Sequence, residues 1–361
     1  MTSNSEPVAW DVAERVAGRV ARRNTVDIDW ATLRSLISDF QEVTEQAEDL
    51  VERSTGLRSL EGPARAQVST REEWVHANVS SFRRLLGPML ERAGKEGHGF
   101  PAAFGPVGRI ASGTEMGVVL GWMSGRVLGQ YDLLFADGDA PQDIVHYVGP
   151  NIVSLERRYG FEPREFRLWI ALHELTHRAQ FTGVPWLRAY FIELVEKGVA
   201  MASPDARQIV DAIGRMAVQI LSGRNPIAES GLMGALASPE QLETLRSIQG
   251  LMSLLEGHGD VTMDRAASDA IPSAARFSEV LRSRRESASG LTRFFQQLIG
   301  FDAKLKQYAD GERFVREIER TGGPELLALA WESPGNMPCV AEIREPDRWV
   351  LRVQGRSLEP A

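Results

Sequence analysis

Two histidines and a glutamate in the stretch LWIALHELTHRAQF, residues 168–181, have the types and the spacing of a metal-dependent hydrolytic site. His173, Glu174 and His177 form the pattern H-E-x-x-H, which occurs in zinc-dependent hydrolases. On a helix, residues four apart lie on one face, so both imidazoles can bind one metal ion. Glu174 then lies beside that ion, where its carboxylate can take a proton from water and pass it to a leaving group. The spacing therefore predicts a zinc site with Glu174 as its general base.

The same stretch has a second interpretation, a buried core helix whose two histidines have ordinary hydrogen-bond partners. Glu174, Thr176 and Arg178 count against it, because packing alone gives no reason for polar groups in a buried run and an unpaired buried charge is costly. The apolar residues around the motif fit a buried helix in either case: Phe166, Trp169, Ile170, Leu172 and Leu175. We therefore favour the metal.

A catalytic zinc ion usually has three protein ligands, so the two histidines need a partner elsewhere in the chain. The extended pattern H-E-x-x-H-x-x-G-x-x-H would place glycine at 180 and histidine at 183, where this chain has Gln180 and Gly183. The candidates for the third ligand are then Glu193, Glu196 and Glu256. The first two lie on a stretch whose amphipathic pattern needs no metal to explain it.

Glu256 is the candidate that we prefer, because Asp260 follows it at helical spacing and Gly257 and Gly259 leave room for a second helix. Asp260 could then hydrogen-bond the outer nitrogen of a ligand histidine and fix its tautomer. His258 is the competing ligand, but on a helix it is rotated by about 200° from residue 256. A helix break at the glycines would void this reasoning, and a solvated helix end capped by glycine is the alternative.

No motif identifies the donor that would stabilise the negative charge on a substrate carbonyl oxygen in the transition state. His258, Tyr147 and Tyr131 are weak candidates for this donor. The two tyrosines, like His146, lie on predicted strands, where a packing or sheet-edge role is the commoner one.

Composition and charge limit the classes of partner. Of the 361 residues, 43% are hydrophobic and 25% are charged, as in ordinary globular proteins. The net charge of −8 at pH 7 argues against a nucleic-acid partner, because such proteins are usually basic. The single cysteine, Cys339, excludes internal disulfides and cysteine-rich zinc modules. Charged residues interrupt the N-terminal segment, which therefore does not read as a signal peptide, and we expect a cytoplasmic protein.

The hydrophobic periodicity predicts a mainly α-helical chain with a small antiparallel β-sheet, an α+β arrangement. Thr70 and Glu73 have the spacing of a capping box at the start of one helix. Gln130–Phe135 and Ile144–Val148 are predicted strands, and an edge of their sheet could hold an extended substrate. The VLRV segment at 350–353 is a further strand candidate. Besides the metal helix, we expect helices at 8–22, 29–53, 187–200, 205–222, 239–256, 273–288 and 291–308.

Glycines recur at every fourth position from Gly113 to Gly129. Such a stripe lets another helix approach closely. A membrane span is the alternative, but Glu115 and Arg126 leave only ten uncharged residues between them, short of the roughly 20 that a span needs. We expect a packed internal helix and no membrane partner. Without repeats or linkers, the chain should form one domain over 1–361, with a metal-site core at 109–265 between helical parts at 1–108 and 266–361.

Three blocks of this sequence resemble a family of zincin-like proteins, mostly from actinobacteria, that have been proposed to be zinc-dependent metallohydrolases or metalloproteases. The blocks are LHELTHRAQFTGVPWLR, LMSLLEGHGDVTMD and GFDAKLKQYADGERFV, and the resemblance runs from about residue 110 to the end. It implies a zincin-like metallopeptidase fold, Zn²⁺ bound by His173 and His177, and Glu174 as base, and it supports Glu256 as third ligand. Some members are associated by gene neighbourhood with synthesis of a deazaflavin cofactor.

The leading hypothesis from the sequence is a zinc-dependent hydrolase, a peptidase acting on a peptide or small amide. The alternative is a non-catalytic zinc-containing binding or scaffold protein linked to cofactor metabolism. Glu174 favours the enzyme, because a structural zinc site needs no base and is usually closed by four protein ligands.

Overall fold

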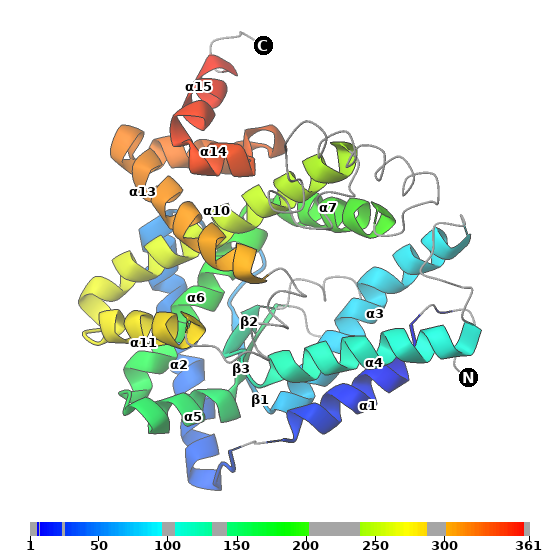
Figure 1. Cartoon of the computed structure of the whole chain (residues 1–361). Helices are drawn as coiled ribbons and strands as arrows, with labels where there is room; N and C mark the ends of the chain where they lie inside the picture. The colour runs from blue at the N-terminus through cyan, green and yellow to red at the C-terminus, as the bar shows by residue number, and fades with distance from the viewer. Residues whose placement is uncertain are drawn as a thin grey trace.

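A computed structural model describes residues 6, 8–23, 26–95, 105–131, 143–201, 239–286 and 301–356, and Figure 1 shows their arrangement. These residues are mostly helical and contain one small sheet, as the periodicity predicts. The helices are α1 (Trp10–Ala21), α2 (Trp30–Thr55), α3 (Arg71–Lys95), α4 (Gly105–Ser124), α5 (Gly149–Tyr159), α6 (Pro163–Gly183), α7 (Leu187–Met201), α10 (Pro239–Ala270), α11 (Ala274–Glu286), α13 (Phe301–Glu332), α14 (Val340–Arg344) and α15 (Pro346–Arg356). The strands are β1 (Arg65–Ser69), β2 (Gly129–Tyr131) and β3 (Ile144–Val148).

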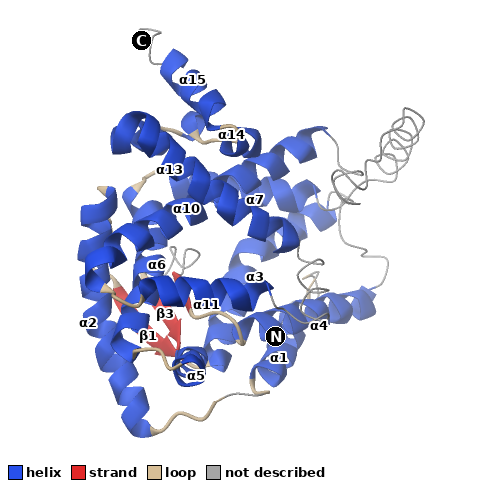
Figure 2. Cartoon of the chain, turned by 60° about the vertical axis from the view of Figure 1, so that its left-hand side comes forward, coloured by secondary structure: helices blue, strands red, loops and turns tan. Residues whose placement is uncertain are grey.

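The sheet has the strand order β1-β3-β2, and helices surround it in Figure 2. β2 and β3 pair antiparallel, which confirms the predicted pairing. β1 pairs with the other side of β3 in parallel, so the sheet is mixed rather than purely antiparallel. The sequence of β1, RAQVS, is too short and polar to be recognised as a strand without its partner. β2 is the edge strand on the other side, and residues 132–135 of the predicted strand lie outside the described residues.

The helix that carries the H-E-x-x-H motif is α6. At its start the carboxylate of Glu162 accepts a hydrogen bond from the backbone N–H of Glu165 at 2.6 Å. Pro163 occupies the first turn, where its missing N–H costs no helical hydrogen bond. The helix ends at Gly183, and a Cβ atom at that position would lie 2.8 Å from the backbone oxygen of Arg58. Both ends of the helix are therefore fixed by local contacts.

Arg178 ties α6 to its surroundings through a buried group of ion pairs. Its side chain is 1% exposed and donates to Asp143 Oδ1 at 2.7 Å, to Glu48 Oε1 at 2.5 Å and to the backbone oxygen of Gly62 at 2.5 Å. These partners come from α2, from the loop before β1 and from the residue before β3. The charge of Arg178 is thus compensated by carboxylates, and its burial is not an argument for a metal, contrary to the sequence-based reasoning.

Two apolar clusters meet along α10. The C-terminal part of this helix packs Met263 and Ala267 into a cluster formed mainly by α2, β3, α5 and α6. Its N-terminal part packs Leu251 and Leu254 into a second cluster with α7, α13, α14 and α15. Glu256 lies between these two sets of packed residues, so packing on both sides of it fixes the orientation of this part of α10.

The glycines of the stripe up to Gly121 pack α4 against α1, as predicted, and the two helices run side by side in Figure 1. The predicted helix does not reach Gly129, because α4 ends at Ser124 and Gly129 lies in β2. A Cβ atom at Gly113 would lie 2.4 Å from Ala9 O, and one at Gly117 would lie 2.6 Å from Ala13 O. Among the described residues, none of the helices is long and apolar enough to cross a membrane. The cytoplasmic location and the lack of a nucleic-acid partner stay predictions.

Several predicted boundaries change. The segment 350–353 is part of α15, so the strand prediction there was wrong. α10 continues through Gly257 and Gly259 to Ala270, well beyond the predicted end. The capping box is confirmed, because Thr70 N–H donates to Glu73 Oε2 at 2.7 Å and Glu73 N–H donates to Thr70 Oγ1 at 3.1 Å. The predicted helix at 205–222 and residues 291–300 lie outside the described residues.

Candidate metal centre

His173 and His177 extend from α6 toward α10, and Glu256 meets them from α10. The Nε2 atoms of the two histidines are 3.2 Å apart. Glu256 Oε2 lies 3.9 Å from His173 Nε2 and 3.8 Å from His177 Nε2. Among the described residues, these three form a group whose potential ligand atoms all lie within 4.8 Å of one another. The structure thus brings together the three residues that were predicted as ligands.

The donor set of this group fits a zinc ion. Zinc bonds of about 2.0–2.2 Å in a tetrahedron place neighbouring ligand atoms roughly 3.3 Å apart, close to the spacing of the two histidine nitrogens. His177 Nδ1 lies 2.9 Å from Gln180 Oε1, so the Nδ1–H donates there and Nε2 presents a lone pair. A lone pair that faces a second imidazole and a carboxylate is stabilised by a cation between them.

Continuity of α10 decides which side chain faces the histidines. Glu256 and Met263 are two turns apart on one face, and Met263 Sδ lies 3.2 Å from His173 Nδ1. A Cβ atom at Gly259, on the same face, would lie 3.7 Å from His177 Cε1 and 3.8 Å from His173 Nδ1. α10 has no break at Gly257 or Gly259, so residues 256 and 258 point to different sides of the helix, as expected.

His258 lies outside the group of three potential ligands. It is buried, and its Nδ1 lies 3.0 Å from Gln180 Nε2. Its ring packs edge-on against Trp331, with centroids 5.2 Å apart. Burial lowers the pKa of His258 to about 3, so the ring is neutral at physiological pH. The bond predicted from Asp260 to a ligand histidine stays a prediction.

Two other predicted candidates, Glu193 and Glu196, are exposed on α7 and do not belong to the group of three. Glu193 pairs with Lys197 Nζ at 2.6 Å, one turn away on the same helix. This ion pair agrees with the amphipathic interpretation of that stretch.

Glu174 is buried against the edge strand β2. Its Oε2 accepts a hydrogen bond from the backbone N–H of Tyr131 at 3.2 Å. A Cβ atom at Gly129 would lie 2.6 Å from Glu174 Cγ, so a glycine is needed where β2 crosses the carboxylate. Burial, and then the charge of Glu256, raise the pKa of Glu174 to about 7, although His177 and the Tyr131 N–H act in the opposite direction. A cation bound beside Glu174 would lower the pKa of its carboxyl group, as His177 and the Tyr131 N–H do.

The comparison with known protein families agrees with this geometry. The family model for zincin-like metallopeptidases matches residues 8–350. The chain belongs to this family. Zincin-like metallopeptidases typically use a metal ion, usually zinc, which the group of His173, His177 and Glu256 suits.

One solved structure is similar to this chain over nearly its whole length. A protein of Chloroflexus aurantiacus, proposed to be a hydrolase and described as having a novel fold, is 29% identical in sequence to this chain. The two superpose with a TM-score of 0.71, over 98% of this chain and 100% of the other. Among curated proteins no significant match is found.

In this zincin-like protein, neither Tyr147 nor Tyr131 is well placed to donate a hydrogen bond to a substrate oxyanion. Tyr147 is fully buried, stacks on Phe40 at 3.9 Å and shares a 2.8 Å hydrogen bond with Thr44 Oγ1. This placement argues for a core role and against a donor role for Tyr147. Tyr131 contacts Glu174 through its backbone, and its partly buried side chain packs on the apolar cluster around α6.

One polar partner in the site was missed at the sequence level. Gln180 is fully buried beside His177 and contacts α10 as well. Its position three residues after His177 places it on the same face of α6, which was the available signal.

Proposed function

We propose that this protein is a zinc-dependent hydrolase that cleaves an amide bond in a peptide or a small amide. The observation that carries the proposal is the convergence of His173, His177 and Glu256, with the buried carboxylate of Glu174 beside them. Membership of the zincin-like metallopeptidase family and the similar Chloroflexus protein support metal-dependent hydrolysis as the class of reaction.

Each residue in the proposed mechanism has a separate task. His173, His177 and Glu256 would hold the zinc ion, which when bound polarises a carbonyl and makes water a better nucleophile. Glu174 takes the proton from the attacking water and passes it to the nitrogen that leaves. Its hydrogen bond from Tyr131 N–H holds the carboxylate in place at the edge of β2.

Among the described residues β2 is an edge strand, and its outer side offers a place for an extended peptide. Val148 N–H donates to Leu128 O at 2.8 Å, and the alternation of an antiparallel ladder then turns the backbone groups of Gly129 and Tyr131 away from β3. The bond from Tyr131 N–H to Glu174 agrees with this direction. The outward backbone groups of β2 other than Tyr131 N–H can pair with a substrate strand, which would bring a substrate carbonyl near Glu174.

The alternative function, a non-catalytic zinc-containing scaffold, has less support. Structural zinc sites are usually closed by four protein ligands, whereas the group described here supplies three. A scaffold also has no use for a carboxylate buried next to the ligands, which costs free energy that a catalytic role would explain.

The test combines metal analysis with one substitution. Protein purified without chelator should contain about one zinc ion per chain, because two imidazoles and a carboxylate suit zinc. Cleavage is then sought in a peptide library and a set of small amides by mass spectrometry.

Glu174→Gln should keep the zinc ion and the fold, and it should slow cleavage by about 100-fold or more, because an amide cannot accept the proton. Glu193→Gln, at an exposed glutamate of α7, is the matched control and should cleave at the original rate. Protein that contains no transition metal and cannot be reconstituted with zinc contradicts the metal assignment. Undiminished cleavage by Glu174→Gln contradicts the role of the base.

A further inference from the structure

Gln180 connects a predicted zinc ligand to the helix that faces it. Its side chain is fully buried between α6 and α10. Gln180 Oε1 lies 2.9 Å from His177 Nδ1, and Gln180 Nε2 lies 3.0 Å from both Leu255 O and His258 Nδ1. Every polar atom of this amide therefore has a partner.

The partners permit only one orientation of the Gln180 amide. Leu255 O is a carbonyl and can only accept a hydrogen bond, so the amide nitrogen must face it. Rotating the amide by 180° would place two acceptors 3.0 Å apart and is excluded. The amide oxygen then faces His177 Nδ1, which must carry a proton, and the lone pair of His177 lies on Nε2, toward His173 and Glu256.

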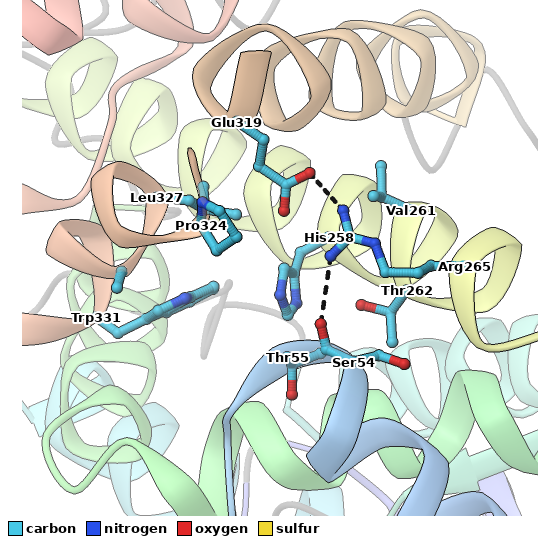
Figure 3. A pocket seen from close by; sticks show the side chains of 11 residues that line it. Ser54, Thr55, His258, Val261, Thr262, Arg265, Glu319, Pro324, Leu327 and Trp331 are labelled. Carbon is cyan, nitrogen blue, oxygen red and sulfur yellow. Dashed lines mark hydrogen bonds and ion pairs between the residues drawn. The ribbon is translucent and has the colours of Figure 1, made fainter. Parts of the chain in front are cut away.

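The second amide hydrogen of Gln180 fixes the protonation of His258. Because that hydrogen points at His258 Nδ1, this nitrogen must accept, and the proton of His258 lies on Nε2. Trp331 packs against the ring from α13. His258 lines a cavity of about 30 Å³ between α2, α10 and α13, and Figure 3 shows its side chain among the residues that line it. Thr262 and Arg265 line the same cavity.

We infer that Gln180 and His258 are positioning residues that hold His177 in the tautomer and orientation required for binding zinc. A histidine without a partner on its outer nitrogen rotates and exchanges its tautomers, and partners of this kind raise metal affinity. Leu255 O and His258 Nδ1 both prevent the amide of Gln180 from turning over. Since these acceptors and Glu256 lie on the same turn of α10, that turn supplies one ligand and orients another. This inference rests on the proposed zinc site.

Gln180 and His258 should contribute unequally to zinc affinity. Replacement of Gln180 leaves the Nδ1–H of His177 without its acceptor, so the full contribution of the outer partner is lost. Replacement of His258 leaves the Gln180–Leu255 bond intact, so the amide keeps one of its two restraints. Asparagine at 258 can place an amide oxygen near the position of Nδ1 and restore the missing acceptor.

The test measures zinc affinity by competition with a chromophoric chelator at constant pH, in Gln180→Met, His258→Leu and His258→Asn. Gln180→Met should bind zinc about 10- to 100-fold more weakly than the original chain, the usual effect of removing an outer partner. His258→Leu should lose less, and His258→Asn should recover most of that loss. Gln46→Met, on the exposed face of α2, is the control and should bind zinc unchanged.

A second readout separates positioning from packing. The visible spectrum of the cobalt-substituted protein should change in Gln180→Met and should return toward the original in His258→Asn. A packing role would lower the unfolding temperature of the metal-free protein without changing either zinc affinity or this spectrum, and that result would overturn the inference. If Gln180→Met does not fold, equal zinc affinities of His258→Leu and His258→Asn would overturn it instead. Absence of zinc binding by the original chain would show that the proposed function itself has failed.

Discussion

Glu256 reaches the histidines of α6 because the backbone of α10 stays helical through two glycines. Gly259 leaves the space that the imidazole rings need, and Gly257 leaves the space for a second close approach, to Gly311 of α13. His258, between them, is turned to Gln180 and Trp331. The choice between Glu256 and His258 as ligand is therefore a matter of helix geometry, and histidine's general preference for zinc does not decide it.

This geometry predicts an order of zinc affinities at the residue scale. Glu256→Ala removes a ligand and should weaken binding by more than the roughly 10- to 100-fold typical of an outer partner. His258→Ala removes one of two restraints on Gln180 and should weaken it by about 10-fold at most. Titration of each variant with zinc against a chelator measures both. If His258→Ala suffered the larger loss, His258 would have to be a direct ligand.

Local spacing predicts which residues share one face of a helix, but it does not predict which distant residues that face contacts. His173, Glu174 and His177 follow from one motif, and Glu256 from its spacing to Asp260 and the neighbouring glycines. The spacing of Gln180 to His177 places both residues on one face of α6. The contacts of Gln180 with α10 could not be predicted in this way, because Leu255 and His258 are distant in sequence. Arg178 was misinterpreted for the same reason, since its carboxylate partners lie on other elements.

The contact of α1 with α4 shows what the glycine stripe does at the scale of whole elements. The backbone of α1 passes so close to α4 that a Cβ atom at Gly117 would lie 2.6 Å from Ala13 O and 2.8 Å from Val16 Cβ. A glycine inside a helix costs about 1 kcal/mol relative to alanine. This free-energy cost occurs at each glycine of the stripe that lies in α4, and the close packing of α1 on α4 offsets it.

Gly117→Ala should therefore destabilise the protein even though alanine is the better helix former. Inserting a methyl group into a packed contact costs about 1–3 kcal/mol, which exceeds the helix-propensity gain over most of that range. Gly18→Ala, in α1, is the matched control, because a Cβ atom there meets only the flexible end of Arg22 at 3.9 Å. It should leave stability unchanged or raise it by up to about 1 kcal/mol. Denaturant unfolding of both variants measures the difference, and equal stabilities would contradict the close packing.

Elements with a strong local pattern were predicted well, and elements defined by a distant partner were not. α1, α2 and α6 have caps or apolar stripes that appear within their own residues. β1 has neither, and only its pairing with β3, more than 70 residues later, makes it a strand. The VLRV segment has the composition of a strand, but its residues continue α15, where Val353 is buried in the cluster around α10 and α13.

At the scale of the whole molecule, the candidate site joins two parts of the hydrophobic core. α6 packs mainly into the cluster with α2 and the sheet, and the residues of α10 just before Glu256 pack into the cluster with α13 to α15. A metal ion bound by His173, His177 and Glu256 would link these helices directly. Binding should then stabilise the folded chain as a unit, since the unfolded chain does not hold the three ligands together.

Zinc should therefore raise the stability of the whole protein, and chelation should lower it. At a free zinc concentration 100 times the dissociation constant, the free energy of unfolding should rise by about 2.7 kcal/mol, provided that zinc does not bind the unfolded chain. Glu256→Ala should show a much smaller gain at the same zinc concentration, because its affinity is lower, while its metal-free stability should stay close to that of the original chain. Denaturant unfolding with and without chelator, followed by circular dichroism, measures all four values. An equal gain in Glu256→Ala would mean that the stabilising ion binds elsewhere, and no gain in the original chain would mean that α6 and α10 are not joined by a metal.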